Sequence, residues 1–360
     1  MTTNYNIIAC DGGGIRGLIT AMLLNDLVSN PPSGATSNIL NNVSLFAGTS
    51  TGGIIAIGLA SGLTPSTLVD LYQKDCSSIF QPYQPSGTAS ALSQLHLPQL
   101  SFDPCSYVPN FCYVKYTNAG LYNLLSTTLK ANQVNPDAAL STLSTKVLLV
   151  TLMMSNTGNT PWSPLALTNL PNSDYEDVAI VDAAMCSSAA PLYFPPYAVP
   201  RPGNATMWCA DGGVVANNPS AFALANVLQS QILQTKSQDL SNVRMLSIGT
   251  GVTIDYVPSN LLNNSVDDWG MLMWMFPLAV SPEPALPLMA AMFDGQAQIA
   301  DMETGNILGN SQYQRANPTL TQTINLDDCG AIPALEKVAN DYIQSSDWAA
   351  TKQWAYKNFI

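Results

Sequence analysis

Residues 5–28 of the chain read YNIIACDGGGIRGLITAMLLNDLV, and this stretch decides the fold class. Its apolar start predicts a short buried strand at 5–10, and its apolar end predicts a helix at 18–28 that stops before Asn30-Pro31-Pro32. A glycine-rich turn joins the two elements. A strand that passes through such a turn into a helix is typical of α/β proteins.

The same alternation continues along the chain. We expect further strands at 43–47, 146–153 and 244–248, and further helices at 52–60, 182–190 and 220–233. Strands that alternate with helices in this way predict an α/β fold with a largely parallel sheet.

The charge balance limits the kinds of partner that the protein can bind. The 360 residues include 12 basic and 24 acidic side chains, which give a formal net charge of -12. This sign argues against nucleic acid and against steady attraction to anionic membranes, so a neutral or zwitterionic partner fits better. The first six residues, MTTNYN, lack the features of a signal peptide. We therefore expect a protein that is cytoplasmic or peripheral at membranes, although a processed secreted form would look the same.

The seven cysteines are dispersed and form no C-x-x-C pair, so they predict no zinc framework. We expect most of them to be reduced and buried. Cys105 and Cys112 lie in a loop-like stretch and form the pair that could bridge in an oxidising compartment.

Two segments interrupt the alternation of strands and helices. Residues 77–118 are rich in Pro, Ser, Gln and Tyr, which predicts an insertion or a cap. Residues 269–293 are strongly apolar but contain several prolines, so we expect no transmembrane helix there. The methionines and tryptophans of this second segment suit an acyl-chain pocket or a lipid interface, and the alternative is an ordinary core helix.

The glycine-rich turn at 11–17, DGGGIRG, fits the spacing G-x-G-x-x-G of a dinucleotide site. Such a site also needs an acidic residue about 20 positions further on to hold the ribose, and residues 31–43 contain none. The same geometry suits an oxyanion hole, because glycines allow backbone N–H groups to point at one spot beside the positive end of a helix. We favour the oxyanion hole.

A second glycine-rich turn, GTSTG at 48–52, also lies between an expected strand and an expected helix. The pattern G-x-S-x-G in that context predicts a nucleophile elbow with Ser50 as the nucleophile. The alternative is a turn in which Ser50 only caps the following helix. An oxyanion loop upstream favours the elbow, because neighbouring strand ends would bring the two turns together.

A serine hydroxyl needs a base to become a nucleophile. The only histidine, His96, precedes the position expected for an α/β-hydrolase histidine and lies in the 77–118 stretch. Asp211, in Cys209-Ala210-Asp211-Gly212-Gly213, follows an expected strand and is the better candidate. Taken alone, it could be an ordinary turn aspartate.

Taken together, these motifs resemble those of the patatin-like phospholipase family. The family patterns D-G-G-G-[IL]-[RK]-G, G-x-S-x-G and D-G-[GA] occur in order at 11–17, 48–52 and 211–213. The stretch SSAAPLYFPP at 187–196 and Asp268-Trp269-Gly270 with Trp274 also resemble the family. The similarity covers residues 5–315, which we expect to form the patatin-like domain, followed by a C-terminal helical extension at 316–360.

The resemblance implies a three-layer sandwich with a central, mostly parallel sheet flanked by helices. It also implies a Ser-Asp dyad of Ser50 and Asp211, with no metal and no cofactor. The implied oxyanion loop consists of Gly12, Gly13, Gly14, Ile15 and Arg16, and the N–H groups of Gly13 and Gly14 would hold the oxyanion. The further motif glycines are Gly17, Gly48, Gly52, Gly212 and Gly213.

The expected activity is that of a carboxylic ester hydrolase of the phospholipase A, lysophospholipase or lipid acyl hydrolase kind. It would release fatty acids from membrane lipid esters through an acyl-serine intermediate, in transient contact with a membrane or micelle surface. Arg16 would either brace the loop through a carboxylate or attract a phosphate headgroup. The alternatives are a catalytically inactive lipid-binding module and a nucleotide-binding enzyme. The sequence predicts no oligomeric state.

Overall fold

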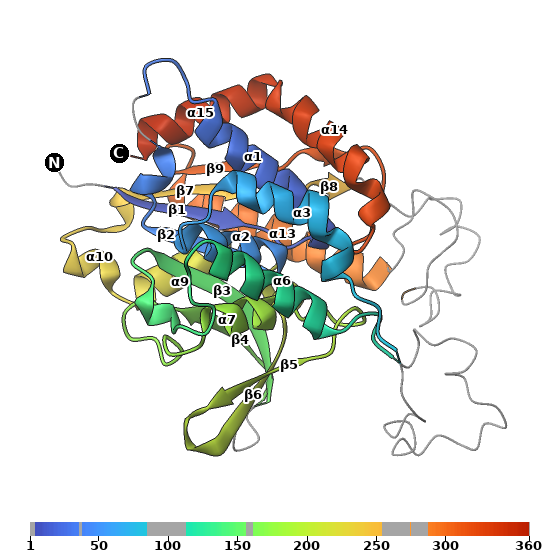
Figure 1. Ribbon diagram of the computed structural model, residues 1–360. Coiled ribbons are helices and arrows are strands. Elements are labelled where there is room, and N and C mark those ends of the chain that lie inside the picture. The colour runs from blue at the N-terminus through green and yellow to red at the C-terminus, as the bar shows by residue number, and fades with distance from the viewer. Residues whose placement is uncertain are drawn as a thin grey trace.

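The computed structural model describes residues 4–35, 38–84, 113–155, 161–253, 274 and 287–359. A sheet of eight strands forms its centre (Figure 1). These strands are β1 (Tyr5–Cys10), β2 (Leu45–Thr49), β3 (Lys146–Ser155), β4 (Ser163–Thr168), β5 (Tyr197–Arg201), β6 (Ala205–Asp211), β7 (Val243–Ile248) and β9 (Tyr313–Ala316). Their order is β5-β6-β3-β2-β1-β7-β9, and β4 pairs with β3.

The sheet is mostly parallel, as the sequence predicts. The strands β3, β2, β1, β7 and β9 all run in one direction. The antiparallel part consists of β4 and β6, which both pair with β3, and of β5, which pairs with β6. The sequence predicts a strand that ends near Asp211 but predicts neither β4, β5 nor β9.

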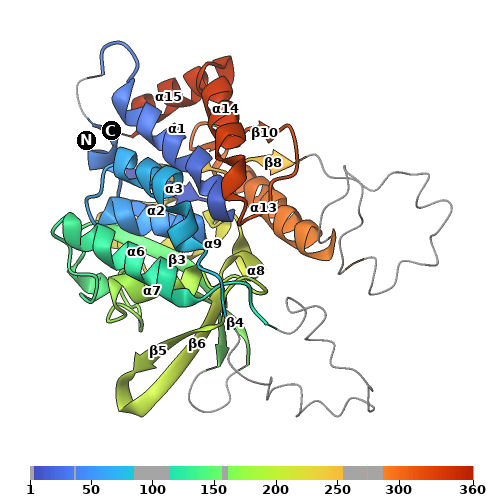
Figure 2. The same cartoon turned by 45° about the vertical axis from the view of Figure 1, so that its right-hand side comes forward.

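Helices cover both faces of the sheet, which confirms the three-layer sandwich (Figures 1 and 2). Side chains alternate along β1, so that Ile8 and Cys10 pack into one core while Ile7 and Ala9 pack into the other. The first core includes side chains of α1 (Gly17–Ser29), α2 (Thr51–Ala60), α3 (Pro65–Ile79), α6 (Asn118–Ala131), α7 (Ile180–Ser187), α14 (Ile332–Ile343) and α15 (Ser346–Asn358). The second includes those of α8 (Gly213–Ala216), α9 (Ser220–Gln229), α10 (Ile232–Thr235) and α13 (Pro287–Leu308).

The predicted helix at 220–233 is wrong in one respect, because the structure divides it into α9 and α10. Gln231 has a φ of 56°, in the left-handed region, and this conformation interrupts the helical hydrogen bonds. A separate pair of short parallel strands, β8 (Val252–Thr253) and β10 (Thr319–Leu320), joins the loop after β7 to the loop after β9.

The C-terminal helices pack into the same core as the N-terminal elements. Leu335 of α14 and Trp348 of α15 are fully buried, and the Trp348 Nε1–H donates to Asp26 Oδ2 of α1 at 2.6 Å. Lys352 Nζ forms an ion pair with the same carboxylate at 2.8 Å. The expected boundary between the patatin-like domain and the C-terminal extension, at residues 315 and 316, lies inside β9. That boundary remains a prediction.

Much of the two unusual segments lies outside the described residues. Of the segment 77–118, residues 85–112 are outside, including His96, Cys105 and Cys112. Of the segment 269–293, only Trp274 and the beginning of α13 are described. In the described part of the chain, no helix is both long and apolar enough to cross a membrane.

A disulfide joins Cys76, near the end of α3, to Cys329, just before α14. Cys10, Cys186 and Cys209 are free and buried, as expected for them, whereas the expectation is wrong for Cys76 and Cys329, which are oxidised. The sequence does not predict the Cys76–Cys329 bond, because these residues are 253 positions apart and lie in no shared motif. The bond fastens the loop that follows β10 to the helix α3.

We expect the disulfide to stabilise the fold, because a cross-link over so long a loop restricts the unfolded chain strongly. Mild reduction should lower the free energy of unfolding by roughly 2–5 kcal/mol, measured by thermal or urea unfolding with and without reductant. The double variant Cys76→Ala/Cys329→Ala is the control, and its stability should not respond to reductant. Equal unfolding of the reduced and oxidised natural chain would contradict this prediction.

Candidate active site

Ser50 lies in the tight turn between β2 and α2. Its backbone φ of 55° and ψ of -122° are those of a strained elbow. The flanking glycines are required by close backbone contacts. A Cβ atom on Gly48 would lie 2.1 Å from the carbonyl oxygen of Gly52, and a Cβ atom on Gly52 would lie 2.1 Å from that of Cys10. The turn therefore has the geometry predicted for G-x-S-x-G.

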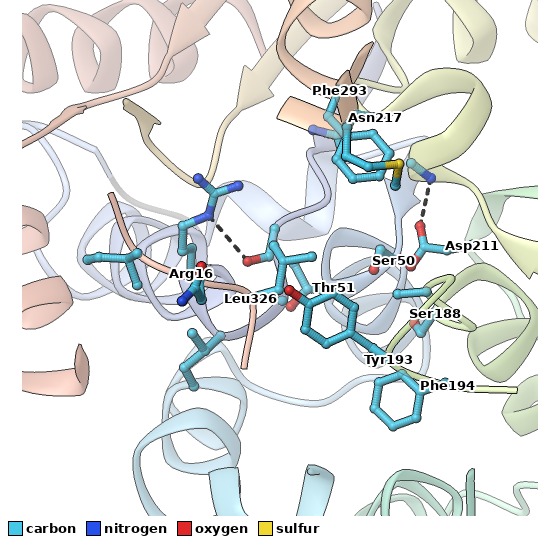
Figure 3. A pocket seen from close by; sticks show the side chains of 18 of the residues that line it. Arg16, Ser50, Thr51, Ser188, Tyr193, Phe194, Asp211, Asn217, Phe293 and Leu326 are labelled. Carbon is cyan, nitrogen blue, oxygen red and sulfur yellow. Dashed lines mark hydrogen bonds between the residues drawn. The ribbon is translucent and has the colours of Figure 1, made fainter. Parts of the chain in front are cut away.

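The register of the strands brings Asp211 to the same edge of the sheet as Ser50. Thr49 of β2 pairs with Val150 of β3, and the next residue of β3, Thr151, pairs with Asp211 at the end of β6. Ser50 directly follows Thr49, so the two predicted members of the dyad come together (Figure 3). The local sequence identifies each residue but does not show that the two lie together.

The Asp211 carboxylate is buried, and burial raises its pKa to about 6. Hydrogen bonding by the Ser50 hydroxyl and by the backbone N–H of Gly213 acts in the opposite direction. The Gly213 N–H donates to Asp211 Oδ1 at 2.6 Å (Figure 3). A carboxylate with a pKa near neutrality can both accept and return a proton under ordinary conditions.

The last residue of α7 and the segment that follows it hold both partners in place. The hydroxyl of Ser187 accepts a hydrogen bond from the Ser50 N–H at 2.9 Å and donates one to the Val150 carbonyl at 2.6 Å. Two residues further on, the Ala189 carbonyl accepts from the Asp211 N–H at 2.9 Å. This bracing is a function that sequence reasoning missed, although Ser187 begins the stretch SSAAPLYFPP that resembles the family.

The glycine loop that follows β1 offers two backbone donors. The N–H groups of Gly12, Ile15 and Arg16 donate to the carbonyls of Asn217, Leu326 and Gly13, at 3.0, 2.8 and 3.2 Å. Within the described residues, the N–H groups of Gly13 and Gly14 donate to no acceptor. These are the two residues of the loop that we expect to hold the oxyanion, and their role remains a prediction.

The loop has little freedom to accept a larger residue. Gly14 has a φ of +58°, and a Cβ atom there would lie 2.3 Å from the carbonyl oxygen of Leu326. That oxygen accepts the Ile15 N–H, so the segment around Leu326 fixes the loop from outside. The disulfide at Cys329 lies three residues beyond Leu326.

A buried ion pair anchors the start of the glycine loop. Both carboxylate oxygens of Asp11 accept from the guanidinium of Arg315 in β9, which also donates to Ser247 Oγ at 2.7 Å. No motif contains Arg315, and 304 positions separate it from Asp11, so nothing in the sequence indicates this pair. Arg16, the residue for which we considered a carboxylate partner, donates through Nε to the Gly13 carbonyl at 3.4 Å.

A cavity of about 170 Å³ opens over Ser50 and Asp211. Most of its wall is apolar and comes from elements on both sides of the site, including Ile54, Phe80, Phe194, Phe293 and Leu326. The described residues contain no group of three His, Cys, Asp or Glu side chains that could hold a metal ion. Ser50, Asp211, Gly13 and Gly14 thus all line one largely apolar cavity.

A family model described as Patatin-like phospholipase matches residues 8–224. The chain belongs to the patatin-like phospholipase family. The matched region includes the glycine loop, the elbow at Ser50 and the turn at Asp211, whereas Arg315 and the disulfide partner Cys329 lie beyond it.

Relatives of this patatin-like chain occur in bacteria and plants. It is 30% identical to a cGAMP-activated phospholipase of Vibrio cholerae, over 75% of this chain and 72% of that protein. It is 29% identical to Patatin-like protein 2 of Arabidopsis thaliana, over 75% of this chain and 65% of that protein. Protein teg of Priestia megaterium is 25% identical over 94% of this chain and 95% of its own length.

Proposed function

We propose that the protein is a serine acyl hydrolase that cleaves lipid esters, with Ser50 as nucleophile and Asp211 as general base. The observation that carries the proposal is the meeting of a strained serine elbow with a buried carboxylate of raised pKa beneath an apolar cavity. Membership of the patatin-like phospholipase family supports a lipid acyl hydrolase activity.

The reaction would proceed through an acyl-serine. Asp211 accepts the hydroxyl proton as Ser50 Oγ attacks the ester carbonyl, and the N–H groups of Gly13 and Gly14 stabilise the oxyanion that forms. The carbon–oxygen bond to the leaving alcohol then breaks, and Asp211 returns the proton to that alcohol. In the second half, Asp211 takes a proton from water, the hydroxide attacks the acyl-serine, and Ser50 regains its proton as the fatty acid leaves.

The apolar cavity favours a fatty acyl chain as the group that is buried. Aromatic and aliphatic side chains line it, and their contacts suit a hydrocarbon better than a polar headgroup. We therefore propose membrane lipid esters as the substrate class, with the headgroup directed outwards and a membrane or micelle as the source of the lipid. We further propose an oxidising compartment, because disulfides persist there; this favours the processed secreted form over the cytoplasmic alternative.

A fluorophosphonate probe tests this function, because it reacts only with an activated serine. We expect covalent labelling of Ser50, identified by mass spectrometry of the digested protein, together with release of fatty acid from a defined mixture of lipids. The Ser50→Ala variant is the matched control and should remain unlabelled. A natural chain that binds lipid vesicles but takes up no probe would instead be a catalytically inactive lipid-binding module.

The pKa of Asp211 predicts the pH below which the activity should fall. Above about pH 6 the carboxylate is ionised and can accept the Ser50 proton, and below that pH it is protonated and cannot. We expect kcat/KM for a soluble short-chain ester to fall roughly tenfold per pH unit below that pH. Activity that stays constant down to pH 4.5 would contradict Asp211 as the base. Because an unperturbed histidine has a pKa of about 6.5, the pH profile alone does not distinguish the two kinds of base.

A further inference from the structure

The outer face of α13 carries a stripe of exposed apolar side chains. Leu288, Met292, Ile299 and Met302 are 38%, 40%, 52% and 60% exposed. At 3.6 residues per turn, these four positions fall within a sector of about 80° on the helix surface. Large apolar side chains that gather on one exposed helix face indicate an interaction surface, whereas single ones are ordinary.

The face of α13 next to the stripe lines the cavity of the proposed active site. Met289 and Phe293 line the cavity over Ser50, one residue beyond Leu288 and Met292 respectively. Further along, Leu308 packs into the core on this side of the sheet. The helix extends towards the right-hand edge of the described body in both views (Figures 1 and 2). The exposed stripe therefore lies on the same helix as part of the cavity wall.

The charges on α13 restrict what the stripe can bind. The helix contains no basic residue, and its acidic residues are Asp294, Asp301 and Glu303. Asp301 lines a separate polar cavity, and Asp294 lines both that cavity and the one over Ser50. Both lie on the helix face away from the stripe, and Glu303 lies at the edge of the stripe. With a net charge of -12 on the whole chain, an anionic bilayer would be repelled. An apolar surface without basic neighbours fits an electrically neutral lipid interface.

We propose that the stripe Leu288, Met292, Ile299 and Met302 is the surface by which the protein docks on a zwitterionic lipid bilayer. The inference rests on the proposed function for its substrate. Burial of these four side chains among headgroups and upper acyl chains would hold α13 in the interface. The cavity on the adjacent face of the same helix would then lie next to the lipid layer, so that an acyl chain could pass into it without crossing water.

The variant Ile299→Gln/Met302→Gln tests the surface. Both side chains are exposed, neither lines the cavity, and glutamine has good helix propensity, so the fold should be retained. We expect binding to phosphatidylcholine vesicles, measured by flotation, to weaken at least tenfold, and hydrolysis of the vesicle lipid to fall with it. The value of kcat/KM for a monomeric short-chain ester should stay within twofold. Trp208→Gln removes a comparably exposed aromatic from β6 and is the control that should leave vesicle binding unchanged.

Four outcomes would contradict the proposed docking surface. Two concern the variants: unchanged vesicle binding by the double variant, or an equal loss of binding in Trp208→Gln. The other two are tighter binding of the natural chain to phosphatidylglycerol than to phosphatidylcholine, and a lipid-free dimer that the double variant dissociates. The last result would make a second copy of the chain the occupant. Vesicle binding does not require hydrolysis, so it separates the two proposals. If the natural chain binds phosphatidylcholine through the stripe but hydrolyses no ester, the docking surface is supported and the proposed function is wrong.

Discussion

Ser50→Ala is expected to abolish ester hydrolysis while leaving the fold unchanged. The substitution removes one oxygen atom and no core volume, and the hydrogen bond that braces the elbow is retained because it uses the Ser50 backbone N–H and the Ser187 hydroxyl. Without a nucleophile, no acyl-enzyme can form. The measurements are fatty acid release by the purified variant, its circular dichroism and its thermal midpoint.

Ser187→Ala is the matched comparison for Ser50→Ala, since it removes a neighbouring hydroxyl that braces the elbow but would not react. We expect it to lower kcat only partly, because the nucleophile and the base remain. If Ser50→Ala retained more than a few per cent of the natural rate with an unchanged spectrum, another residue would have to be the nucleophile.

Asp211→Asn should lower the rate by a factor of about a hundred or more, which is typical for the loss of a general base. The side chain keeps its size, and its Oδ1 can still accept the Gly213 N–H. His96→Gln is the control for the alternative base and should leave kcat within a few fold. If His96→Gln silenced the enzyme while Asp211→Asn stayed active, the proposed dyad would be wrong.

Asp211→Asn should also increase the free energy of unfolding at neutral pH. The pKa of Asp211 lies above its unfolded value, at about 6 against 3.8, so folding disfavours the ionised form. That cost, roughly 3 kcal/mol, is present above pH 6 and disappears as the pH falls from 6 to 4 and the carboxylate is protonated. Asp211→Asn should therefore raise the thermal midpoint at pH 8 and have little effect at pH 4. A lower midpoint at pH 8 would contradict a costly buried carboxylate.

The sequence predicts the parts of this molecule that depend on local geometry. The turn at Ser50 can be predicted because its glycines meet backbone atoms a few residues away in the chain or on the adjacent strand. The alternation of strands and helices likewise indicates the parallel sheet and its layers. Asp211 is identified through its glycine turn, but its position opposite Ser50 depends on the register of β2, β3 and β6, which no local pattern contains.

The features that the sequence does not predict depend on contacts between distant residues. The ion pair of Asp11 with Arg315 and the disulfide of Cys76 with Cys329 each join positions more than 250 residues apart. In neither pair does the local sequence around one residue indicate the other. The break at Gln231 is missed for a different reason, because glutamine is a good helix former and only its surroundings impose the left-handed conformation.

The disulfide also has a consequence for a cleaved chain. Any single proteolytic cut between Cys76 and Cys329 produces two fragments that remain covalently joined. After a cut between Cys76 and Asp211, Ser50 would lie on one polypeptide and Asp211 on the other. Such a nicked protein would migrate as one band in denaturing electrophoresis without reductant and as two bands with it, so an apparently intact band would not prove an intact chain.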